Sequence, residues 1–591
     1  MEPAPTPTRG GRLSQAVYGS DLIVELLASL GYEYIAINPG ASFRGLHDSL
    51  VNFRIPGAPK IITCTHEEIA VAMGHGYWKT AGKPMAAALH NIVGLQHGAM
   101  AIFNAWCDRA PVMVLGGTGP MDASMRRPHI DWVHTALVQG NQVRDYVKLD
   151  DQPASIASFP ESMLRTHKVM MTEPHGPVYV CFDVDLQEDR LAAPITVPDP
   201  RRYLPAASPA PNRTALAEAV DLLVAADWPV ILVEDVGREA GAFGHLRDLA
   251  EALGCGVIDR GGRISFASNH PLDLSLSSEA ALKRADVVLA LNVLGLGNVA
   301  PVPHQRGLEP THIQDAAKVI HITMTEYLVH SWATDYERLP AVDVLIGADP
   351  VVALPELLEL VRSEQGRYPA ARDKAAQRRA SVEVMHNEAL TRVQERSQRD
   401  WGLAPISAAR LYGEIWAQVQ NTPWAMNRQP RGMMDFSDPA QSFTGGGGGG
   451  GLGYSYPAAL GGRLGMTDRD RVCINISGDG DFLMTSNAMW TASHYNIPVL
   501  QIIFNNRAYY QDEGHQSFMA RDRERPTDDL GNGIMIDNPN VDHAGLAKSF
   551  GIEGFGPVGD PDKLGAVLRQ AIHAVRDEQR PVLVDVLTQK R

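Results

Sequence analysis

Two apolar runs near the C-terminal end of this 591-residue chain each end in a short polar motif. Gly478-Asp479-Gly480 closes the run 472–477, and Asn505-Asn506 closes the run 499–504, with 24 residues between the two motifs. We interpret the runs as neighbouring strands of a parallel sheet, joined by a helix over 482–495. Because open α/β sheets bind ligands at the carboxyl ends of their strands, the spacing predicts a site with one carboxylate and one carboxamide.

The chemistry of these groups indicates a phosphate and a divalent cation. Free backbone N–H groups at the start of the predicted helix, beside Asp479, favour an anion. Mg²⁺ prefers oxygen ligands and usually combines a few protein groups with phosphate oxygens. We therefore expect Asp479, the Asn506 side chain and the backbone carbonyl of Ala508 to hold Mg²⁺ next to a diphosphate.

This arrangement resembles the signature of the thiamine diphosphate (ThDP) enzymes, in which a GDG motif is followed after some two dozen residues by NN. Residues 489–498 look most like benzoylformate decarboxylase, within the group of 2-oxo acid decarboxylases and acetolactate synthase-like enzymes. The resemblance implies that Gly478, Gly480 and Asp481 also contact the cofactor. It further implies an α/β fold of three doubly wound parallel-sheet domains: a pyrimidine-binding domain over 13–190, a middle domain over 212–362 and a diphosphate-binding domain over 401–591.

The alternation of predicted elements agrees with parallel sheets that are covered on both faces. A proline-rich linker over 194–211 separates the first two predicted domains, and a charged helix over 370–399 connects the last two. Helices are expected over 20–30 and 67–81, and strands over 34–37, 85–89, 111–115, 178–182, 230–233, 287–291, 319–322 and 342–346.

The composition of the chain limits the kinds of partner that we expect the protein to bind. A formal net charge of -15 argues against nucleic acid, because binding to a phosphate backbone needs clustered Lys and Arg. We find no apolar run long enough for a membrane span and no apolar core of a signal peptide. The five cysteines are odd in number and mostly lie in apolar segments, which is typical of buried thiols in a reducing compartment. We therefore expect a cytoplasmic protein that acts on small molecules.

The resemblance assigns a catalytic carboxyl group. ThDP enzymes use a glutamate that hydrogen-bonds the aminopyrimidine ring and so promotes loss of the proton from the thiazolium C2 atom. This position matches Glu67, which we expect both to contact the cofactor and to act in catalysis. Glu68 is the competing candidate. We favour Glu67 because the residues that follow it, 70–77, are close to the family's run after its glutamate.

His90 lies 23 residues beyond Glu67. Benzoylformate decarboxylase carries a histidine at this distance, where it transfers protons around the bound substrate. A histidine at the end of a strand faces the ligand crevice and titrates near neutral pH, which suits this role. We interpret His90 as catalytic; the alternative is a histidine that only makes hydrogen bonds within the strand crossover.

Three further residues are candidates for the substrate pocket. The family's serine that contacts the substrate carboxylate corresponds here to Ala41, and Ser42, one residue later, could take its place. Pyruvate decarboxylase has a pair of adjacent histidines farther along the chain, where this sequence has only His129 nearby. For His129 a role in the pocket and a purely local structural role stay equally open.

The glycine run over 445–451 allows two interpretations. It is either a flexible low-complexity loop or a segment whose backbone approaches a ligand closely. The resemblance favours the second: the carbonyl of Gly450 would accept a hydrogen bond from the cofactor's amino group, and Leu452 would wedge between its two rings. The long polar segment 507–540 is typical of a lid or of a disordered loop.

The sequence thus predicts a ThDP- and Mg²⁺-dependent enzyme that cleaves or forms a carbon–carbon bond next to a carbonyl. His90 and the residues around Trp490 favour a non-oxidative 2-oxo acid decarboxylase with carboligase activity. The alternative is an acetolactate synthase-like carboligase, and a rival of another class is a non-catalytic ThDP-binding regulatory protein. Binding of FAD stays open. In the family one active centre combines two chains, which implies a homodimer or homotetramer with active sites at the subunit interface.

Overall fold

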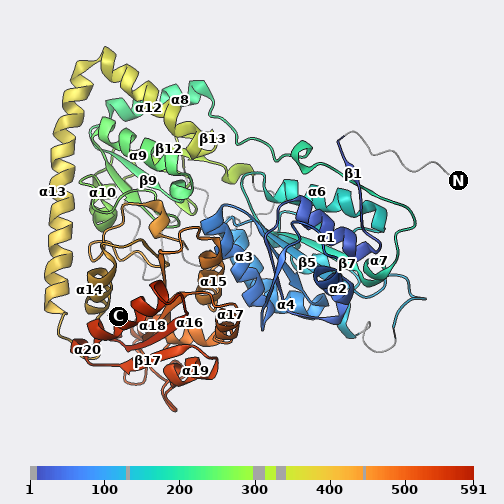
Figure 1. The fold of residues 1–591 in the computed structure, drawn as a ribbon. Coiled ribbons are helices and arrows are strands. Elements are labelled where there is room, and N and C mark those ends of the chain that lie inside the picture. Colours follow the sequence, from blue (N-terminus) through green and yellow to red (C-terminus); the bar gives the residue numbers. More distant parts are fainter. Residues whose placement is uncertain (1–9, 128–132, 297–312, 328–340, 444–447, 591) are drawn as a thin grey trace.

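The fold is α/β, with three parallel sheets that follow one another along the chain (Figure 1). The computed structural model describes residues 10–127, 133–296, 313–327, 341–443 and 448–590. The sequence prediction of an α/β fold with several parallel sheets is confirmed. A short antiparallel pair, β1 (Arg12–Leu13) with β8 (Thr196–Val197), adds to them and falls partly in the predicted proline-rich linker.

The N-terminal sheet has six parallel strands with helices on both faces. Its central strands are buried along their whole length, as expected where helices cover both sides of a parallel sheet. In spatial order the strands are β3 (Lys60–Thr63), β2 (Tyr34–Ile37), β4 (Met85–Leu89), β5 (Val112–Thr118), β7 (Val178–Asp183) and β6 (Asp150–Asp151). The helices are α1 (Gly19–Ser29), α2 (Arg44–Asn52), α3 (Glu67–Ala81), α4 (Asn91–Cys107), α6 (Phe159–Met170) and α7 (Val184–Glu188).

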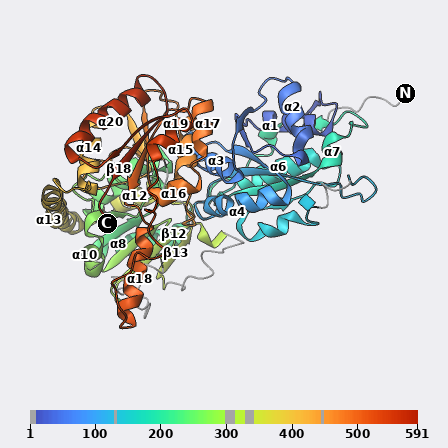
Figure 2. The same cartoon turned by 90° about the horizontal axis from the view of Figure 1, so that it is seen from below.

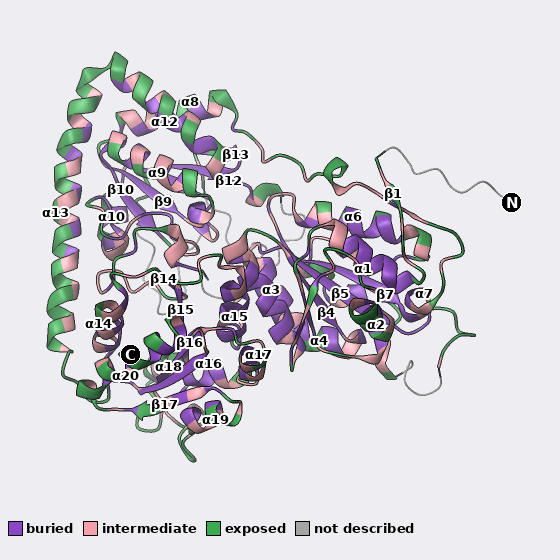
Figure 3. Ribbon diagram, in the orientation of Figure 1, coloured by how far each residue is buried: buried purple, intermediate pink, exposed green. Residues whose placement is uncertain are grey.

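The middle sheet has five parallel strands and its own apolar core. In spatial order they are β10 (Gly256–Asp259), β9 (Pro229–Val233), β11 (Val287–Leu291), β12 (Lys318–Thr323) and β13 (Val344–Gly347). The helices around it are α8 (Arg213–Ala225), α9 (Ala240–Leu253), α10 (Ser278–Arg284) and α12 (Pro350–Arg367). The predicted connecting helix is α13 (Pro369–Arg399), which runs along the outer edge of the molecule with few buried residues (Figures 1 and 3).

The C-terminal sheet places the two polar motifs side by side. Strands β15 and β16 pair in parallel, with Gly478 opposite Phe504, so both motifs emerge at the same edge. In spatial order the strands are β14 (Trp424–Met426), β15 (Val472–Gly478), β16 (Val499–Asn505), β18 (Val582–Leu587) and β17 (Glu553–Val558). The helices are α14 (Ala408–Val419), α15 (Ser455–Gly465), α16 (Asp479–Met484), α17 (Ala488–His494), α18 (Tyr510–Asp522), α19 (His543–Ser549) and α20 (Pro561–Arg576).

The single helix predicted over 482–495 is wrong. The segment forms two short helices, α16 and α17, and the chain turns between them. Tertiary hydrogen bonds hold the break: the Thr485 hydroxyl donates to the carbonyl of Gly453 at 2.6 Å, and the carbonyl of Asn487 accepts from the Thr65 hydroxyl at 3.2 Å. These contacts tie the residues at the break to distant segments of the chain.

The polar segment 507–540 is more ordered than the lid-or-disorder interpretation suggested. It contains the 13-residue helix α18, in which Ala520 is the one buried residue. Figure 2 shows α18 extending away from the body of the protein. Because this helix buries so little apolar surface, its stability depends mainly on its own sequence rather than on packing.

Among the described residues, no helix combines the length and the apolar character that crossing a bilayer requires. All five cysteines are free thiols, and all except the half-buried Cys107 are buried.

Helices α3 and α15 join the N-terminal and C-terminal parts of the chain through backbone contact (Figure 1). A Cβ atom on Gly76 would lie 1.8 Å from the carbonyl oxygen of Ala458, and one on Gly461 would lie 1.9 Å from that of Met73. The Thr80 hydroxyl also donates to the carbonyl of Gly462 at 2.8 Å. Glycine is therefore required at both contact points, because any side chain would force the two helices apart.

We predict that Gly461→Ala destabilises the protein by several kcal/mol, since backbone atoms cannot move aside as a flexible side chain can. Gly462→Ala is the matched control on the same helix. Its Cβ would lie 3.3 Å from the Phe443 ring and 3.6 Å from both the carbonyl oxygen of Gly76 and Cγ2 of Thr80, without the backbone clash of Gly461. Alanine also gains up to about 1 kcal/mol of helix propensity. Thermal unfolding should show a much lower Tm for Gly461→Ala than for Gly462→Ala; equal Tm values would contradict the proposed contact.

Candidate functional site

Asp479 lies buried at the carboxyl edge of the C-terminal sheet, as the first residue of α16. Backbone N–H groups near its carboxylate, including those of Arg507 and Ala508 just beyond β16, favour the charged form and lower the pKa. Burial nevertheless raises the pKa of Asp479 to about 6, since desolvation outweighs their effect. The two motifs thus meet in space, with the carboxylate of one against the turn that follows the other.

This turn is strained. Arg507 has a φ of 57°, in the left-handed region that costs a non-glycine residue about 1–2 kcal/mol. The side-chain carbonyl of Asn506 accepts the N–H of Ala508 at 3.1 Å, which holds the carboxamide within the turn. Gly480 has no room for a side chain, because a Cβ atom would lie 2.5 Å from the Tyr509 ring. Strain of this kind persists where the surrounding structure fixes the backbone, as at ligand sites.

A cavity of about 200 Å³ beside Asp479 is rich in carboxylates. Asp585 and Asp542 also line it. The carboxylate of Asp585 accepts from Asn505 at 2.9 Å through one oxygen, and its second oxygen is buried without a partner among the described residues. Burial raises the pKa of Asp585 to about 6. A carboxylate, a carboxamide and backbone carbonyls are hard oxygen donors, so the residues present at this edge fit Mg²⁺.

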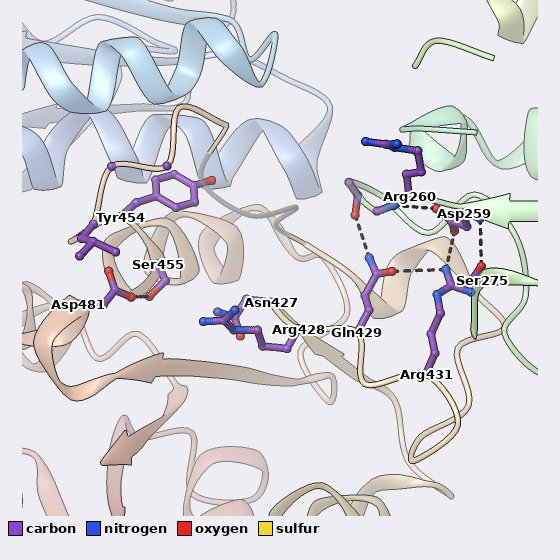
Figure 4. Close-up of a pocket in the computed structure, with 15 residues that line it drawn as sticks. Asp259, Arg260, Ser275, Asn427, Arg428, Gln429, Arg431, Tyr454, Ser455 and Asp481 are labelled. Carbon is purple, nitrogen blue, oxygen red and sulfur yellow. Dashed lines mark hydrogen bonds and ion pairs between the residues drawn. The ribbon is translucent and has the colours of Figure 1, made fainter. Parts of the chain in front are cut away.

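A larger cavity, of about 530 Å³, lies between the middle and C-terminal sheets (Figure 4). Gly450, Leu452 and Asp481 line it, which brings three of the predicted cofactor-binding residues together. Asp479 and Asn506 are not among its lining residues. The middle domain contributes the end of β10 and the residues that follow it, and the C-terminal part contributes the segment after β14. The lining residues from these segments are Asp259, Arg260, Gly261, Gly262, Ser275, Asn427, Arg428, Gln429 and Arg431.

Polar contacts fix the loop that carries Leu452. Asp481 accepts the N–H of Gly453 at 2.6 Å and the hydroxyl of Ser455 at 3.0 Å. The buried side chain of Asn104 on α4 accepts the N–H of Gly451 at 3.2 Å and donates to its carbonyl at 3.3 Å. Leu452 itself is 45% exposed, so its side chain is free to contact a ligand.

The described part of the glycine run packs directly on α4. Cβ atoms on Gly448, Gly449 and Gly451 would lie 2.6 Å, 2.5 Å and 2.4 Å from atoms of Asp108, Phe103 and Met100, respectively. Gly450 has a φ of 72°, which glycine adopts without strain. Close approach to α4 therefore explains these glycines, whereas residues 445–447 lie outside the described part of the chain.

Glu67 begins α3 and is 4% exposed. One carboxylate oxygen lies 3.2 Å from Nδ1 of His97 on α4. The other packs against Gly94, where an added Cβ atom would lie 2.7 Å away. His66 caps α3 by accepting the N–H of Glu68 and stacks on the His97 ring, with centroids 4.8 Å apart. Burial lowers the pKa of His66, which favours its neutral form.

Ser42, His90 and His134 form a hydrogen-bonded chain. The Ser42 hydroxyl lies 3.0 Å from Nδ1 of His90, and Nε2 of His90 lies 3.1 Å from Nδ1 of His134. Asn91 donates its backbone N–H to Ser42 at 3.2 Å. Burial and the neighbouring His134 lower the pKa of His90. Gly40 makes room for the His90 ring, which would lie 2.4 Å from a Cβ atom at that position.

The structure describes Ala41 but not His129, the two other residues predicted for the substrate pocket. Ala41 begins the short helix η1 (Ala41–Phe43) beside Ser42 and offers no polar side chain. His129 lies outside the described residues. Sequence reasoning missed His134, His97 and Asn104, because each acts through contacts with residues more than 25 positions away. The segment after β14 was missed because β14 has only three residues.

Glu68, the rejected competitor of Glu67, has a different environment. Its carboxylate lies near the loop that carries Leu452, since a Cβ atom on Gly453 would be 3.4 Å from it. Burial and the charge of Asp481 raise the pKa of Glu68 to about 7. An ionised Glu68 would therefore repel Asp481, the carboxylate that holds this loop.

Comparisons with known proteins agree on the fold and on the class of site. Residues 17–137 match the family described as thiamine pyrophosphate enzyme, N-terminal TPP binding domain, and residues 425–586 match its C-terminal TPP binding domain. The chain is 25% identical to benzoylformate decarboxylase of Pseudomonas aeruginosa, covering 96% of this chain and 98% of that protein. It is 23% identical to acetolactate synthase of Bacillus subtilis, over 96% and 92%. The crystal structure of benzoylformate decarboxylase from Polynucleobacter necessarius superposes with a TM-score of 0.74 at 18% identity, over 98% and 99%.

We predict that Glu68→Gln stabilises the protein at high pH. A carboxyl group with a raised folded-state pKa binds its proton more tightly when folded, so stability falls as pH rises from about 4.5 to about 7. The glutamine variant lacks this loss, so it should be more stable at pH 8 by about 1–2 kcal/mol, which is less than the full shift implies because solvent screens the partly exposed carboxylate. Tm values of both proteins at pH 5 and pH 8 test this.

The exposed Glu359 on α12 provides the control, and Glu359→Gln should leave the pH dependence unchanged. A Glu68→Gln protein whose Tm follows the wild-type pH profile would contradict the prediction.

Proposed function

Because the chain belongs to the thiamine diphosphate enzyme family, a family of decarboxylases and carboligases, we propose that it is a ThDP- and Mg²⁺-dependent decarboxylase of 2-oxo acids with carboligase activity. The observation that carries the proposal is the chain of Ser42, His90 and His134. It offers a hydroxyl and two imidazoles for a substrate carboxylate and for proton transfer. The benzoylformate decarboxylase among its relatives supports the same activity.

The cofactor supplies, when bound, a carbon nucleophile and an electron sink. Asp479, Asn506 and the carbonyl of Ala508 would hold Mg²⁺ and, through it, the diphosphate. Leu452 would contact the cofactor from the rim of the 530 Å³ cavity, where Asp481 and Asn104 keep its loop in place. These residues bind and orient; they do not themselves exchange protons with the substrate.

Glu67 would hydrogen-bond the pyrimidine ring through its buried carboxyl group. The His97 contact and the packing against Gly94 restrict this side chain to one orientation, which lowers the entropy cost of meeting the ring. Burial within the protein also keeps water away from the carboxyl group.

Proton transfer to the substrate falls to His90. Since Ser42 already accepts the N–H of Asn91, its hydroxyl hydrogen is free to donate to Nδ1 of His90. Nε2 of His90 then carries the hydrogen and shares it with Nδ1 of His134. His90 would thus deliver a proton from Nε2 in its protonated, imidazolium form and so become neutral. His134, once it has itself taken up a proton from water at Nδ1, would return a proton to Nε2 of His90.

In the part of the chain that the structure describes, neither of the two cavities above brings Glu67 together with Asp479 or Leu452. Glu67 lines neither the 530 Å³ cavity nor the cavity beside Asp479. This separation supports the proposal that a second copy of the chain contributes Glu67, in a homodimer or homotetramer. The substrates would be small 2-oxo acids and aldehydes, and the cytoplasm is the proposed location.

We predict that Glu67→Gln still binds ThDP in the presence of Mg²⁺ and loses activity by a factor of about 10²–10⁴. Calorimetry measures binding, and CO₂ release from a panel of 2-oxo acids, with and without acceptor aldehydes, measures turnover. Aryl and branched 2-oxo acids should exceed pyruvate. Condensation of two pyruvates as the main reaction would favour the acetolactate synthase-like alternative, and binding without turnover of any substrate would favour a regulatory protein.

We predict that His134→Asn changes the pH dependence of kcat. The limb of the pH profile that follows the titration of His90 should move to higher pH. The His134 imidazole lowers the pKa of His90, so removing it lets that pKa rise. Turnover should also fall by about 10²-fold, at the lower end of proton-transfer contributions. A purely structural role would change Tm or KM and leave the pH limb in place, which would contradict the relay.

A further inference from the structure

His66, Glu67 and His97 form a cluster with the composition of a transition-metal site. Each offers one donor atom, and these atoms all lie within 4.8 Å of one another. Two imidazoles and one carboxylate are the ligand set of open zinc sites in proteins, which keep a further position for an exogenous ligand. The residues come from two elements: His66 and Glu67 from the start of α3, and His97 from α4.

The geometry is close to that of a bound ion. Metal–ligand bonds of about 2.0–2.2 Å place two ligands of a tetrahedral ion roughly 3.3–3.5 Å apart. The carboxylate of Glu67 and Nδ1 of His97 already lie 3.2 Å apart. The donor atoms of the cluster lie up to 4.8 Å apart, so the farthest pair must approach by roughly 1.3–1.5 Å. The rings of His66 and His97 are stacked and must also turn so that both nitrogens point at the ion, and the 58% exposed side chain of His97 has the freedom to do so.

Two ligands of the cluster are held in place by their surroundings, and the third is open to solvent, so that an ion can enter. Glu67 is held by packing against Gly94, and His66 is held as the cap of α3. His97 provides access from solvent. Mg²⁺, which prefers oxygen ligands, is a poor match for two imidazoles, whereas Zn²⁺, Co²⁺ and Ni²⁺ are good matches.

We propose that His66, Glu67 and His97 bind a divalent transition-metal ion in the cofactor-free protein, and that this ion and ThDP exclude each other. The exclusion rests on the proposed function, because there Glu67 must meet the pyrimidine ring. A metal-bound Glu67 has its carboxylate engaged and cannot make that hydrogen bond. Bound Zn²⁺, Co²⁺ or Ni²⁺ would therefore hold the protein in an inactive, cofactor-free form.

Titration of the metal-stripped, cofactor-free protein with Co²⁺, followed by its visible absorption, tests the site. We expect one tight Co²⁺ per chain. His97→Asn should weaken binding by about tenfold or more, since losing a ligand costs at least as much as losing one of its supporting partners. His66→Asn should do the same, and asparagine keeps an acceptor for the helix cap so that α3 stays intact.

His573→Asn is the matched control. His573 on α20 is 60% exposed and lies 3.5 Å and 3.3 Å from two carboxylates, but it contacts no second histidine in the described structure. Its loss should leave Co²⁺ affinity unchanged. Equal Co²⁺ affinity of wild type, His97→Asn and His66→Asn would overturn the site.

A second titration, with ThDP and Mg²⁺ already bound, separates this inference from the proposed function. Suppressed Co²⁺ binding supports both. Undiminished Co²⁺ binding that still depends on His97 keeps the metal site, and it overturns both the exclusion and the role of Glu67 at the cofactor ring. ThDP binding without any Co²⁺ binding overturns the metal site and leaves the proposed function standing.

Discussion

The contact between α3 and α15 fixes the relative position of the parts that carry the site. Gly76 and Gly461 bring the two helix backbones together with no side chain between them. α3 begins at Glu67, and α15 begins three residues after Leu452. A small change in this crossing would therefore move Glu67 and the Leu452 loop of one chain relative to each other, and with them the two proposed sites to which they contribute. Rigid packing at small residues is a direct way to hold such distant groups in register.

Side-chain hydrogen bonds fix the conformation of the glycine loop, in addition to the helix crossing that fixes the positions of α3 and α15. Asn104 ties the glycine run to α4, Asp481 ties the next residues to α16, and Thr485 adds a third connection to Gly453. The loop has little side-chain packing of its own, because it is built of glycine. Its conformation therefore depends on buried polar partners, which are costly to leave unpaired. A loop held in this way can present its backbone to a ligand without losing much entropy on binding.

Local patterns predicted the elements that are governed by local physics. The helix over 67–81 and the strands over 34–37, 85–89 and 287–291 coincide with α3, β2, β4 and β11, because continuous apolar runs bounded by polar residues mark buried strands. Prediction failed where contacts between distant segments decide the outcome. Thr485 and Asn487 break the helix over 482–495 through such contacts. His134 gains a role only because the fold brings it to His90, 44 residues earlier.

Two histidines, His97 on α4 and His90 at its N-terminal cap, have different hydrogen-bond partners, which is why they are proposed for different chemistry. His90 faces Ser42 and His134, so it shares hydrogens with a hydroxyl and a second imidazole. His97 faces Glu67, so it pairs with a carboxyl group. One helix thus separates the proposed proton-transfer chain from Glu67, the carboxyl group proposed to meet the cofactor ring. The same closeness that lets His97 orient Glu67 also lets the pair share a metal ion, so precise orientation of the carboxyl group carries an inherent sensitivity to such ions.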